Sequence, residues 1–340
     1  MLVKKNILII GFGSIGQRHY RNLKKIFKNK INFFLLRKIY KVPLLSENNR
    51  VKKNQKNLTN TKNILKSLSE IKKKNLKIDA AFICTPSSIH IHQLIWLLKN
   101  NINTFVEKPL SNDLKKIHKL KNILKKTSAI SMIGYQMRFN PIIKFLCNEN
   151  NYKKVIGKLN YAEIYNGEDV RNFHSWEDYR KSYTSKKHLG GGVTLSQIHE
   201  FDYFNLLFQK YKIIKSKSMI SKVSNFEIDV DDTSSHLFKL KKNKENVICS
   251  LHLNFYENPK KRIIRFIGEK GSLEADLNNN KIKFLTNNKI KIKKFKFKRN
   301  DLFKDEIKYF FNCINLRKKK HDLDLSYAIE NLKFVLKLKS

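Results

Sequence analysis

The segment Gly11-Phe12-Gly13-Ser14-Ile15-Gly16 constrains the fold of this chain more than any other. It follows the apolar run Ile7 to Ile10 and opens a stretch with helical spacing. In such a strand–turn–helix unit the first glycine permits the tight turn, the second lets the backbone approach a pyrophosphate, and the third allows close packing of helix on strand. The helix N-terminus also offers unpaired N–H groups to phosphates. The pattern predicts a dinucleotide site made by Gly11, Gly13, Ser14, Ile15 and Gly16. The alternative is a glycine-rich turn without a ligand.

Short apolar runs alternate with amphipathic stretches from residue 6 to residue 135. Alternation of this kind predicts an α/β fold with a doubly wound, parallel Rossmann sheet. The expected strands are 7–10, 33–36, 80–84, 104–106 and 130–133, and the expected helices are 15–27, 64–71, 90–98 and 114–124.

The pattern changes after Pro141. Successive strand-like runs with short turns predict a second α/β domain with a mostly antiparallel, open sheet. We expect domain 1–140 to bind the nucleotide and domain 141–340 to serve substrate binding and oligomerisation, with the last helix packing back on the first domain. Ser326 is the expected N-cap of that helix. The expected strands are 158–165, 213–220, 234–240, 247–255, 263–267 and 282–285, and the expected helices are 195–208, 301–316 and 326–338.

The charge of the chain raises the question of a nucleic-acid partner. Its 340 residues include 71 Lys and Arg against 28 Asp and Glu, a formal net charge of +43. Only 11 of the basic residues are arginine, and the lysines are spread over every segment. A protein that recognises nucleic-acid bases through its side chains would be expected to have a cluster of arginines. We therefore expect no nucleic-acid partner, and the 41% hydrophobic content excludes general disorder.

Cysteine usage and hydropathy indicate the compartment. The four cysteines are far apart and lack the paired spacing of zinc or redox motifs, which favours a reducing compartment. An uninterrupted apolar stretch of about eighteen residues, as a membrane span requires, is absent. We expect a cytoplasmic protein with no membrane partner and no metal. Asp229, Asp231 and Asp232 cluster like metal ligands, but a turn is the preferred interpretation.

The end of the second expected strand bears on the choice of dinucleotide. An acidic residue there would accept hydrogen bonds from the ribose of NAD, whereas this chain has Arg37 and Lys38. Positive charge suits a ribose 2′-phosphate, which favours NADP over NAD. The alternative is that both side chains are simply solvated, as lysine and arginine are abundant throughout.

Four further motifs follow in order. They are ICTPSSIH at 83–90, EKP at 107–109, GYQMRFNP at 134–141, and a triple glycine at 190–192 that leads to His199. Together with the glycine turn, they resemble the Gfo/Idh/MocA oxidoreductases, named for glucose–fructose oxidoreductase and inositol dehydrogenase. The resemblance runs over nearly the whole chain. It implies an NAD(P)-dependent enzyme acting on a small-molecule sugar or sugar derivative, with a homodimer or homotetramer as its expected state.

Lys108 lies at the carboxyl end of an expected strand, where open α/β sheets bind ligands. Pro109 disfavours helical backbone at Lys108, so the lysine can be aimed into the cleft. The resemblance implies that this lysine touches both the nicotinamide and the substrate hydroxyl; an ordinary surface lysine is the alternative. The expected cofactor contacts in this region are Thr85, Pro86, His90, Glu107 and Lys108.

His199 lies on the helix that follows the triple glycine. Its ordinary pKa lies near physiological pH, which suits it to exchange a hydroxyl proton as hydride leaves carbon. The family commonly has an aspartate in the first turn of this helix, and Ser196 is found here instead. Ser196 and Asp202 are therefore the candidate proton relay, with Glu200 as another acid that could compensate. The departure also leaves open a nucleotide-binding sensor or structural subunit without turnover.

Four side chains are candidates for substrate binding. Arg138 either contacts ligand or holds the domain junction. Trp176, Tyr179 and Tyr183 lie before the triple glycine, and sugars bind through aromatic faces and side-chain hydrogen bonds; packing of this segment is the alternative. The sequence around His199 also resembles members associated with nucleotide-sugar or surface-polysaccharide biosynthesis.

Overall fold

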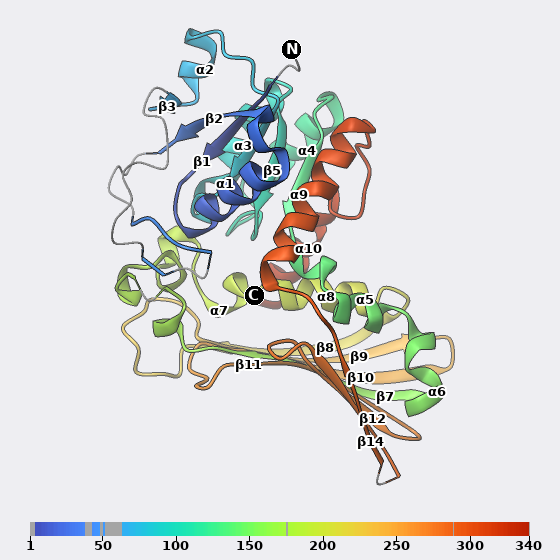
Figure 1. Cartoon of the computed structure of the whole chain (residues 1–340). Helices are drawn as coiled ribbons and strands as arrows, with labels where there is room; N and C mark the ends of the chain where they lie inside the picture. The colour runs from blue at the N-terminus through green and yellow to red at the C-terminus, as the bar shows by residue number, and fades with distance from the viewer. Residues whose placement is uncertain are drawn as a thin grey trace. The chain divides into compact units, whose positions relative to one another are not determined.

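The computed structural model describes residues 4–37, 43–47, 50–51, 63–174, 176–287 and 289–339. They form two compact units (Figure 1). The first unit lies within Met1–Tyr135 and Phe303–Lys333, and the second within Gln136–Leu302 and Phe334–Ser340. Most of both closing helices thus groups with the first unit. The division into domains 1–140 and 141–340 stays a prediction.

The first unit contains a six-stranded, all-parallel sheet in the order β3-β2-β1-β4-β5-β6. This is the strand order of a Rossmann sheet, so the predicted fold class is confirmed. The strands are β1 (Lys5–Ile10), β2 (Ile31–Leu36), β3 (Ile64–Leu65), β4 (Ala80–Ile83), β5 (Asn103–Glu107) and β6 (Ser131–Gly134). The helices are α1 (Ser14–Phe27), α2 (Ser69–Lys73), α3 (His90–Lys99), α4 (Ile117–Lys126), and most of α9 (Arg299–Asn315) and α10 (Leu325–Lys339).

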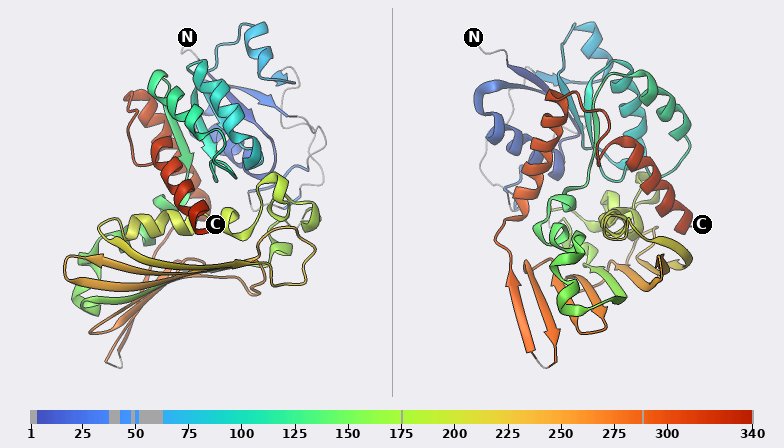
Figure 2. Two further views of the ribbon diagram at one scale, coloured as in Figure 1. Left: turned by 180° about the vertical axis from the view of Figure 1, so that it is seen from behind. Right: turned by 90° about the vertical axis from the view of Figure 1, so that its right-hand side faces the viewer.

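Helices cover both faces of this sheet, which is why its central strands are continuous apolar runs. Ile7 to Ile10 of β1 and all four residues of β4 are fully buried. Helices α1 and α9 lie on one face and α3 and α4 on the other (Figure 2). Phe310 of α9 packs edge-on against Phe82 and Phe105 of the sheet, with both ring separations 5.8 Å.

The second unit contains an eight-stranded sheet in the order β14-β13-β12-β11-β7-β10-β9-β8. Only β7 and β10 pair in parallel, so the predicted mostly antiparallel sheet is confirmed. The strands are β7 (Leu159–Gly167), β8 (Lys212–Ser221), β9 (Thr233–Lys242), β10 (Glu245–Asn254), β11 (Lys261–Gly268), β12 (Ser272–Asp276), β13 (Lys281–Thr286) and β14 (Lys289–Lys294). The helices are α5 (Pro141–Cys147), α6 (Lys153–Ile156), α7 (Val193–Ser196) and α8 (His199–Leu207).

One face of this sheet carries the core of the second unit. Helices α5, α7 and α8 lie over it (Figure 1), and Phe204 of α8 packs on Phe238 of β9 with ring centroids 4.6 Å apart. The inward residues of β9 and β10 are buried, while the opposite face presents exposed side chains such as Leu237 and Ile248. The sheet is therefore amphipathic and open on one side.

Three local predictions were wrong. The segment predicted as helix 64–71 is split into β3, which pairs with Leu35 and Leu36 of β2, and the short helix α2. The helix predicted over 195–208 is interrupted, so that α7 ends at Ser196 and α8 starts at His199. Asp324, not Ser326, caps α10, because its Oδ1 accepts hydrogen bonds from the backbone N–H groups of Ser326 and Tyr327.

Candidate functional site

The glycine turn between β1 and α1 has the geometry expected of a phosphate-binding turn. Gly11 has a φ of +87°, and a Cβ there would lie 2.6 Å from the carbonyl oxygen of Cys84. A Cβ on Gly16 would lie 2.2 Å from the carbonyl oxygen of Gly11. Gly13 differs, because nothing lies within 4 Å of its Cβ position. The outer two glycines are thus needed by the fold itself, and Gly13 leaves an open space that suits a pyrophosphate.

The first turn of α1 complements this space. Ser14 and Ile15 begin the helix, no side chain caps it, and its first turn contains no acidic residue. The first N–H groups of a helix have no intrahelical partner, and they carry the positive end of the helix dipole. An anionic phosphate therefore fits the residues present here.

The end of β2 places Arg37 near the same edge of the sheet. Arg37 directly follows Leu36 and is half-buried. The backbone N–H of Gly11 donates to the Leu36 carbonyl oxygen at 2.9 Å, which ties the end of β2 to the glycine turn. Lys38 lies outside the described residues.

The ends of β4 and β5 carry the other expected cofactor residues. Thr85 and Pro86 follow β4, and Glu107 ends β5 just before Lys108. Thr85, Pro86 and Lys108 are half-buried, so parts of their surfaces reach solvent at the carboxyl edge of the sheet. That edge is where doubly wound sheets bind their ligands.

His90 has a position different from the expected direct contact with the cofactor. It is 1% exposed, and its two ring nitrogens lie 3.0 Å and 2.7 Å from the carbonyl oxygens of Pro109 and Thr85. Burial lowers the pKa of His90, against the effect of those two carbonyl groups. His90 thus lies between backbone carbonyl groups of the segments after β4 and β5, and the ring nitrogen that carries the proton donates to one of them.

The second unit builds the surroundings of His199. Gly190 and Gly192 have φ values of +89° and +104°, and a Cβ on Gly192 would lie 2.3 Å from the carboxylate of Asp231. That carboxylate accepts from the backbone N–H of Thr194 at 3.0 Å and from its hydroxyl at 2.6 Å. Asp231 therefore fixes the start of α7, a role that its local sequence did not reveal. His199 is 5% exposed at the start of α8.

The acidic residues near His199 are engaged with arginines. The guanidinium of Arg138 holds the fully buried carboxylate of Asp202 through contacts of 2.9, 3.0 and 3.2 Å. Glu200, also fully buried, lies 2.7 Å from Arg262. Arg138 and Asp202, which were expected in separate roles, are thus brought together. Ser196, which is 8% exposed, ends α7, whereas Asp202 lies in α8.

The aromatic residues before the triple glycine form two small groups. The ring of His174 lies 4.9 Å from that of Trp176 and 6.3 Å from that of Tyr183. Tyr179 packs edge-on against Phe226 at 6.0 Å. His174, which was not among the expected site residues, is therefore a neighbour of two of the expected substrate residues.

The three aspartates at 229–232 act locally. Asp229 accepts from the backbone N–H of Lys187 at 2.7 Å, and Asp232 accepts from the backbone N–H groups of Val223 and Ser224 at 2.8 and 2.9 Å. Each carboxylate, including that of Asp231, caps a different piece of backbone. The interpretation of the cluster as a turn stays a prediction.

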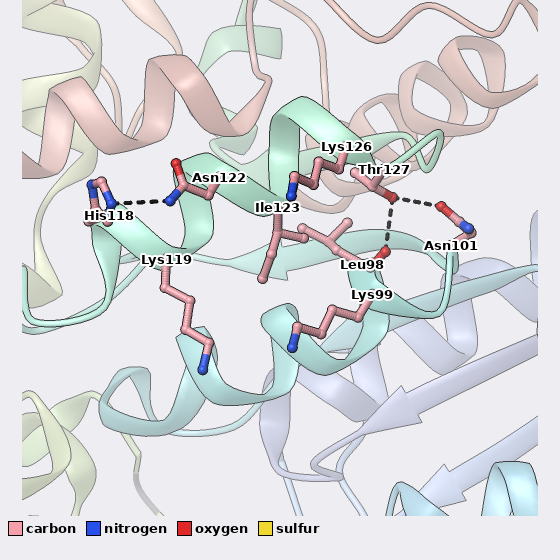
Figure 3. Close-up of a pocket in the computed structure, with 9 residues that line it drawn as sticks. All are labelled: Leu98, Lys99, Asn101, His118, Lys119, Asn122, Ile123, Lys126 and Thr127. Carbon is pink, nitrogen blue, oxygen red and sulfur yellow. Dashed lines mark hydrogen bonds between the residues drawn. The ribbon is translucent and has the colours of Figure 1, made fainter.

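A hollow of about 470 Å³ lies elsewhere in the first unit, between α3 and α4 (Figure 3). Lys99, Lys119 and Lys126 surround it, with Leu98 and Thr127 from the ends of the two helices. Those ends lead to the amino edge of the sheet, opposite to the carboxyl edge that holds Lys108. None of the expected site residues lines this hollow, so size alone does not identify the functional site.

The described part of the chain has no helix long and apolar enough to cross a membrane.

Comparison with known proteins supports the oxidoreductase interpretation. Residues 5–135 match the model of the Gfo/Idh/MocA "oxidoreductase family, NAD-binding Rossmann fold". A 4-carboxy-2-hydroxymuconate-6-semialdehyde dehydrogenase from Sphingobium sp. is 24% identical over 274 residues, which cover 78% of this chain and 77% of that protein. The match therefore extends through both units.

Solved structures show the same fold over almost the full length. A myo-inositol 2-dehydrogenase from Lactobacillus plantarum has a TM-score of 0.72 at 18% identity, covering 99% of this chain and 96% of the other. A UDP-N-acetylglucosamine 3-dehydrogenase from Acidithiobacillus ferrooxidans has a TM-score of 0.71 at 15% identity, covering 99% and 97%. At these identities the likeness establishes the fold.

Proposed function

Residues 5–135 belong to the Gfo/Idh/MocA oxidoreductases. We propose on this basis that the protein transfers a hydride between a nicotinamide dinucleotide and a carbinol or carbonyl carbon of a sugar or sugar derivative. One observation carries the proposal: the turn from Gly11 to Gly16, with open space at Gly13, lies at the same carboxyl edge of the sheet as Lys108. A dinucleotide bound at the turn would extend along that edge.

The cofactor, when bound, supplies the carbon that accepts or gives up the hydride. In the oxidation direction the substrate hydroxyl loses its proton as its carbon loses hydride, so two groups are needed at the oxygen. We assign Lys108 to polarise the oxygen as a hydrogen-bond donor and His199 to exchange the proton. The ion pair between Arg138 and Asp202 then positions α8, at whose start His199 lies, and we propose no proton transfer through Asp202 in this paired state.

The proposed cofactor is NADP, with NAD as the alternative. Arg37 supports NADP because its guanidinium can hold a ribose 2′-phosphate through paired hydrogen bonds. The family description names NAD, so the preference rests on this side chain. Binding constants of NADPH and NADH, measured by nicotinamide fluorescence for wild type and Arg37→Ala, test it. The proposal expects the variant to lose affinity for NADPH selectively, and equal losses for both cofactors would contradict it.

The proposed substrate class is a sugar, a polyol or a nucleotide sugar. The structural neighbours named for inositol and for UDP-N-acetylglucosamine support it. Trp176 and Tyr183, both tilted against the ring of His174, supply aromatic faces of the kind that pack on sugar rings. A role in nucleotide-sugar or surface-polysaccharide biosynthesis is the narrower form of the proposal.

The test is a turnover assay. Purified protein is incubated with NAD⁺ or NADP⁺ and a panel of inositols, aldoses and UDP-sugars, and absorbance at 340 nm reports reduction. We expect turnover with at least one member and its loss in Lys108→Met and His199→Asn, both of which should still bind NADPH. Wild-type protein that binds NADPH but reduces no cofactor across the panel would instead support the nucleotide-binding sensor.

We also propose that the open face of the second sheet pairs with a second copy of the chain. Leu237 is 50% exposed and Ile248 is 38% exposed on neighbouring strands β9 and β10. Apolar side chains on an unpaired sheet face favour a partner of the same character. The four free thiols support the proposed cytoplasmic location, because oxidising compartments favour disulfides.

A further inference from the structure

Three ionisable side chains meet in the core of the first unit. His19 comes from α1, Glu107 from the end of β5 and Glu306 from α9. One polar atom from each side chain lies within 4.8 Å of the corresponding atoms of the other two. His19 and Glu306 are fully buried, and Glu107 is 7% exposed. Burying such groups is costly unless they are paired, so their arrangement calls for an explanation.

His19 is linked to Lys108 through Glu107. The Nε2 of His19 lies 2.7 Å from Oε1 of Glu107, within hydrogen-bond distance. In the tautomer that has its proton on Nε2, the ring donates to this carboxylate oxygen. The other oxygen of Glu107, Oε2, lies 3.3 Å from the backbone nitrogen of Lys108. A single carboxylate therefore connects a fixed histidine ring to the backbone of the proposed catalytic lysine.

The ring of His19 is held on several sides by aromatic residues. It lies 5.0 Å from the ring of Phe105, 5.3 Å from that of Phe82 and 6.4 Å from that of Phe303. Two of these rings belong to the strands that lead to the carboxyl edge, and the third belongs to α9. The position of Nε2, and with it that of the Glu107 carboxylate, is thus set by close packing.

Glu306 shows how the charge in this cluster is balanced. Among the described residues, neither of its carboxylate oxygens has a hydrogen-bond partner. Burial, and secondly the charge of Glu107, raise the pKa of Glu306 well above its ordinary value, which favours the neutral acid. Only Glu107 then requires a partner, and His19 supplies it. A metal ion bound between them would replace the 2.7 Å hydrogen bond, because each ligand atom would lie about 2.0–2.2 Å from the ion.

We propose that His19 is a positioning residue for Lys108, acting through the carboxylate of Glu107. The inference rests on the proposed role of Lys108 in hydride transfer. Without the His19 hydrogen bond, Glu107 is free to turn away from the Lys108 backbone. The lysine amine then loses its alignment with the substrate oxygen, while the glycine turn that binds the cofactor is untouched.

The test compares three variants. His19→Gln retains an N–H group near the position of Nε2, and His19→Phe fills the same space without a donor. Glu306→Gln is the matched control, equally buried in the same cluster but outside the link to Lys108. With the best panel substrate, His19→Phe should lower kcat about tenfold to a hundredfold with little change in the KM of the cofactor. It should also increase the deuterium isotope effect on kcat. His19→Gln should recover most of the loss, and Glu306→Gln should behave as wild type.

Two measurements keep this test independent of the function proposed above. If no substrate turns over, the rate at which acetic anhydride labels Lys108, followed by peptide mass spectrometry, should still differ between wild type and His19→Phe and be restored in His19→Gln. The proposal is overturned if His19→Phe leaves both kcat and this labelling rate unchanged. It is also overturned if Glu306→Gln is as slow as His19→Phe, or if the purified protein holds one divalent metal ion that Glu306→Gln loses.

Discussion

Replacing Gly13 by alanine separates binding of a dinucleotide from stability of the fold. Gly13 has φ −70° and ψ −163°, a conformation that alanine adopts without strain. Its Cβ would meet no atom within 4 Å. Alanine is a poorer N-cap than glycine but restricts the unfolded chain, so the unfolding free energy should change by about 1 kcal/mol or less.

The same methyl group should weaken cofactor binding strongly. It would occupy the space through which a pyrophosphate approaches the backbone and would displace the phosphate from the N–H groups of α1. Each lost hydrogen bond to a charged group costs about 1.5–3 kcal/mol, so the dissociation constant should increase about 10- to 150-fold. The loss should apply to NADPH and NADH alike, because both carry the pyrophosphate.

The assay pairs fluorescence titration of NADPH with urea unfolding. Gly16→Ala is the contrasting control, because its Cβ would lie 2.2 Å from the Gly11 carbonyl oxygen, and it should lose about 2 kcal/mol or more of unfolding free energy. The reasoning would be refuted if Gly13→Ala bound NADPH as tightly as wild type. It would also fail if Gly13→Ala were destabilised as much as Gly16→Ala.

Three further predictions follow from single contacts. Arg138→Met should lower the unfolding free energy in urea by about 3–5 kcal/mol, because it leaves the Asp202 carboxylate buried without its guanidinium partner; a loss under 1 kcal/mol would contradict this. Burial, with the nearby charge of His252, lowers the pKa of His236 from 6.5 to about 4. Between those pH values only the unfolded chain binds this proton. The unfolding free energy of wild type should therefore fall by up to about 3 kcal/mol between pH 6.5 and pH 4 relative to that of His236→Gln. Equal pH profiles of the two proteins would contradict the lowered pKa of His236. Leu237→Glu should shift the assembly toward monomer in sedimentation velocity, and an unchanged oligomer would exclude this sheet face as the interface.

The Rossmann sheet was predictable from sequence because its signals are local. Ile7 to Ile10 form a continuous apolar run, as expected of a strand buried on both faces, and the three glycines mark the turn that follows. The positions of Lys108 and Thr85 follow from the same logic, since Lys108 comes directly after β5 and Thr85 is separated from the end of β4 only by Cys84. These features depend on residues close together in the chain.

Strand β12 was missed although its burial alternates and it lies inside the sheet, whereas two other missed strands depend on information that the local sequence does not carry. Strand β14 reads as alternating lysine and isoleucine and is exposed throughout, so in a chain with 60 lysines it resembles a solvated segment. Strand β3 has two residues and exists only through its pairing with β2. Both are edge strands, for which burial provides little pattern.

The contacts between charged side chains in the candidate site also could not be predicted from the local sequence. Arg138 and Asp202 lie 64 residues apart, and His19 and Glu107 lie 88 residues apart. Glu107 and Arg138 lie in the motifs EKP and GYQMRFNP, but neither motif identifies the partner, and only the folded chain shows which charges meet. The roles of Lys108 and His199 stay predictions until tested.

The most direct test of the account is the origin of the hydrogen that reaches the nicotinamide ring. A panel substrate that supports turnover is supplied with deuterium on all its carbons, in ordinary water, and the reduced cofactor is analysed by mass spectrometry and NMR. Direct hydride transfer predicts one deuterium at C4 of the nicotinamide. A reduced cofactor carrying only solvent hydrogen would contradict the account.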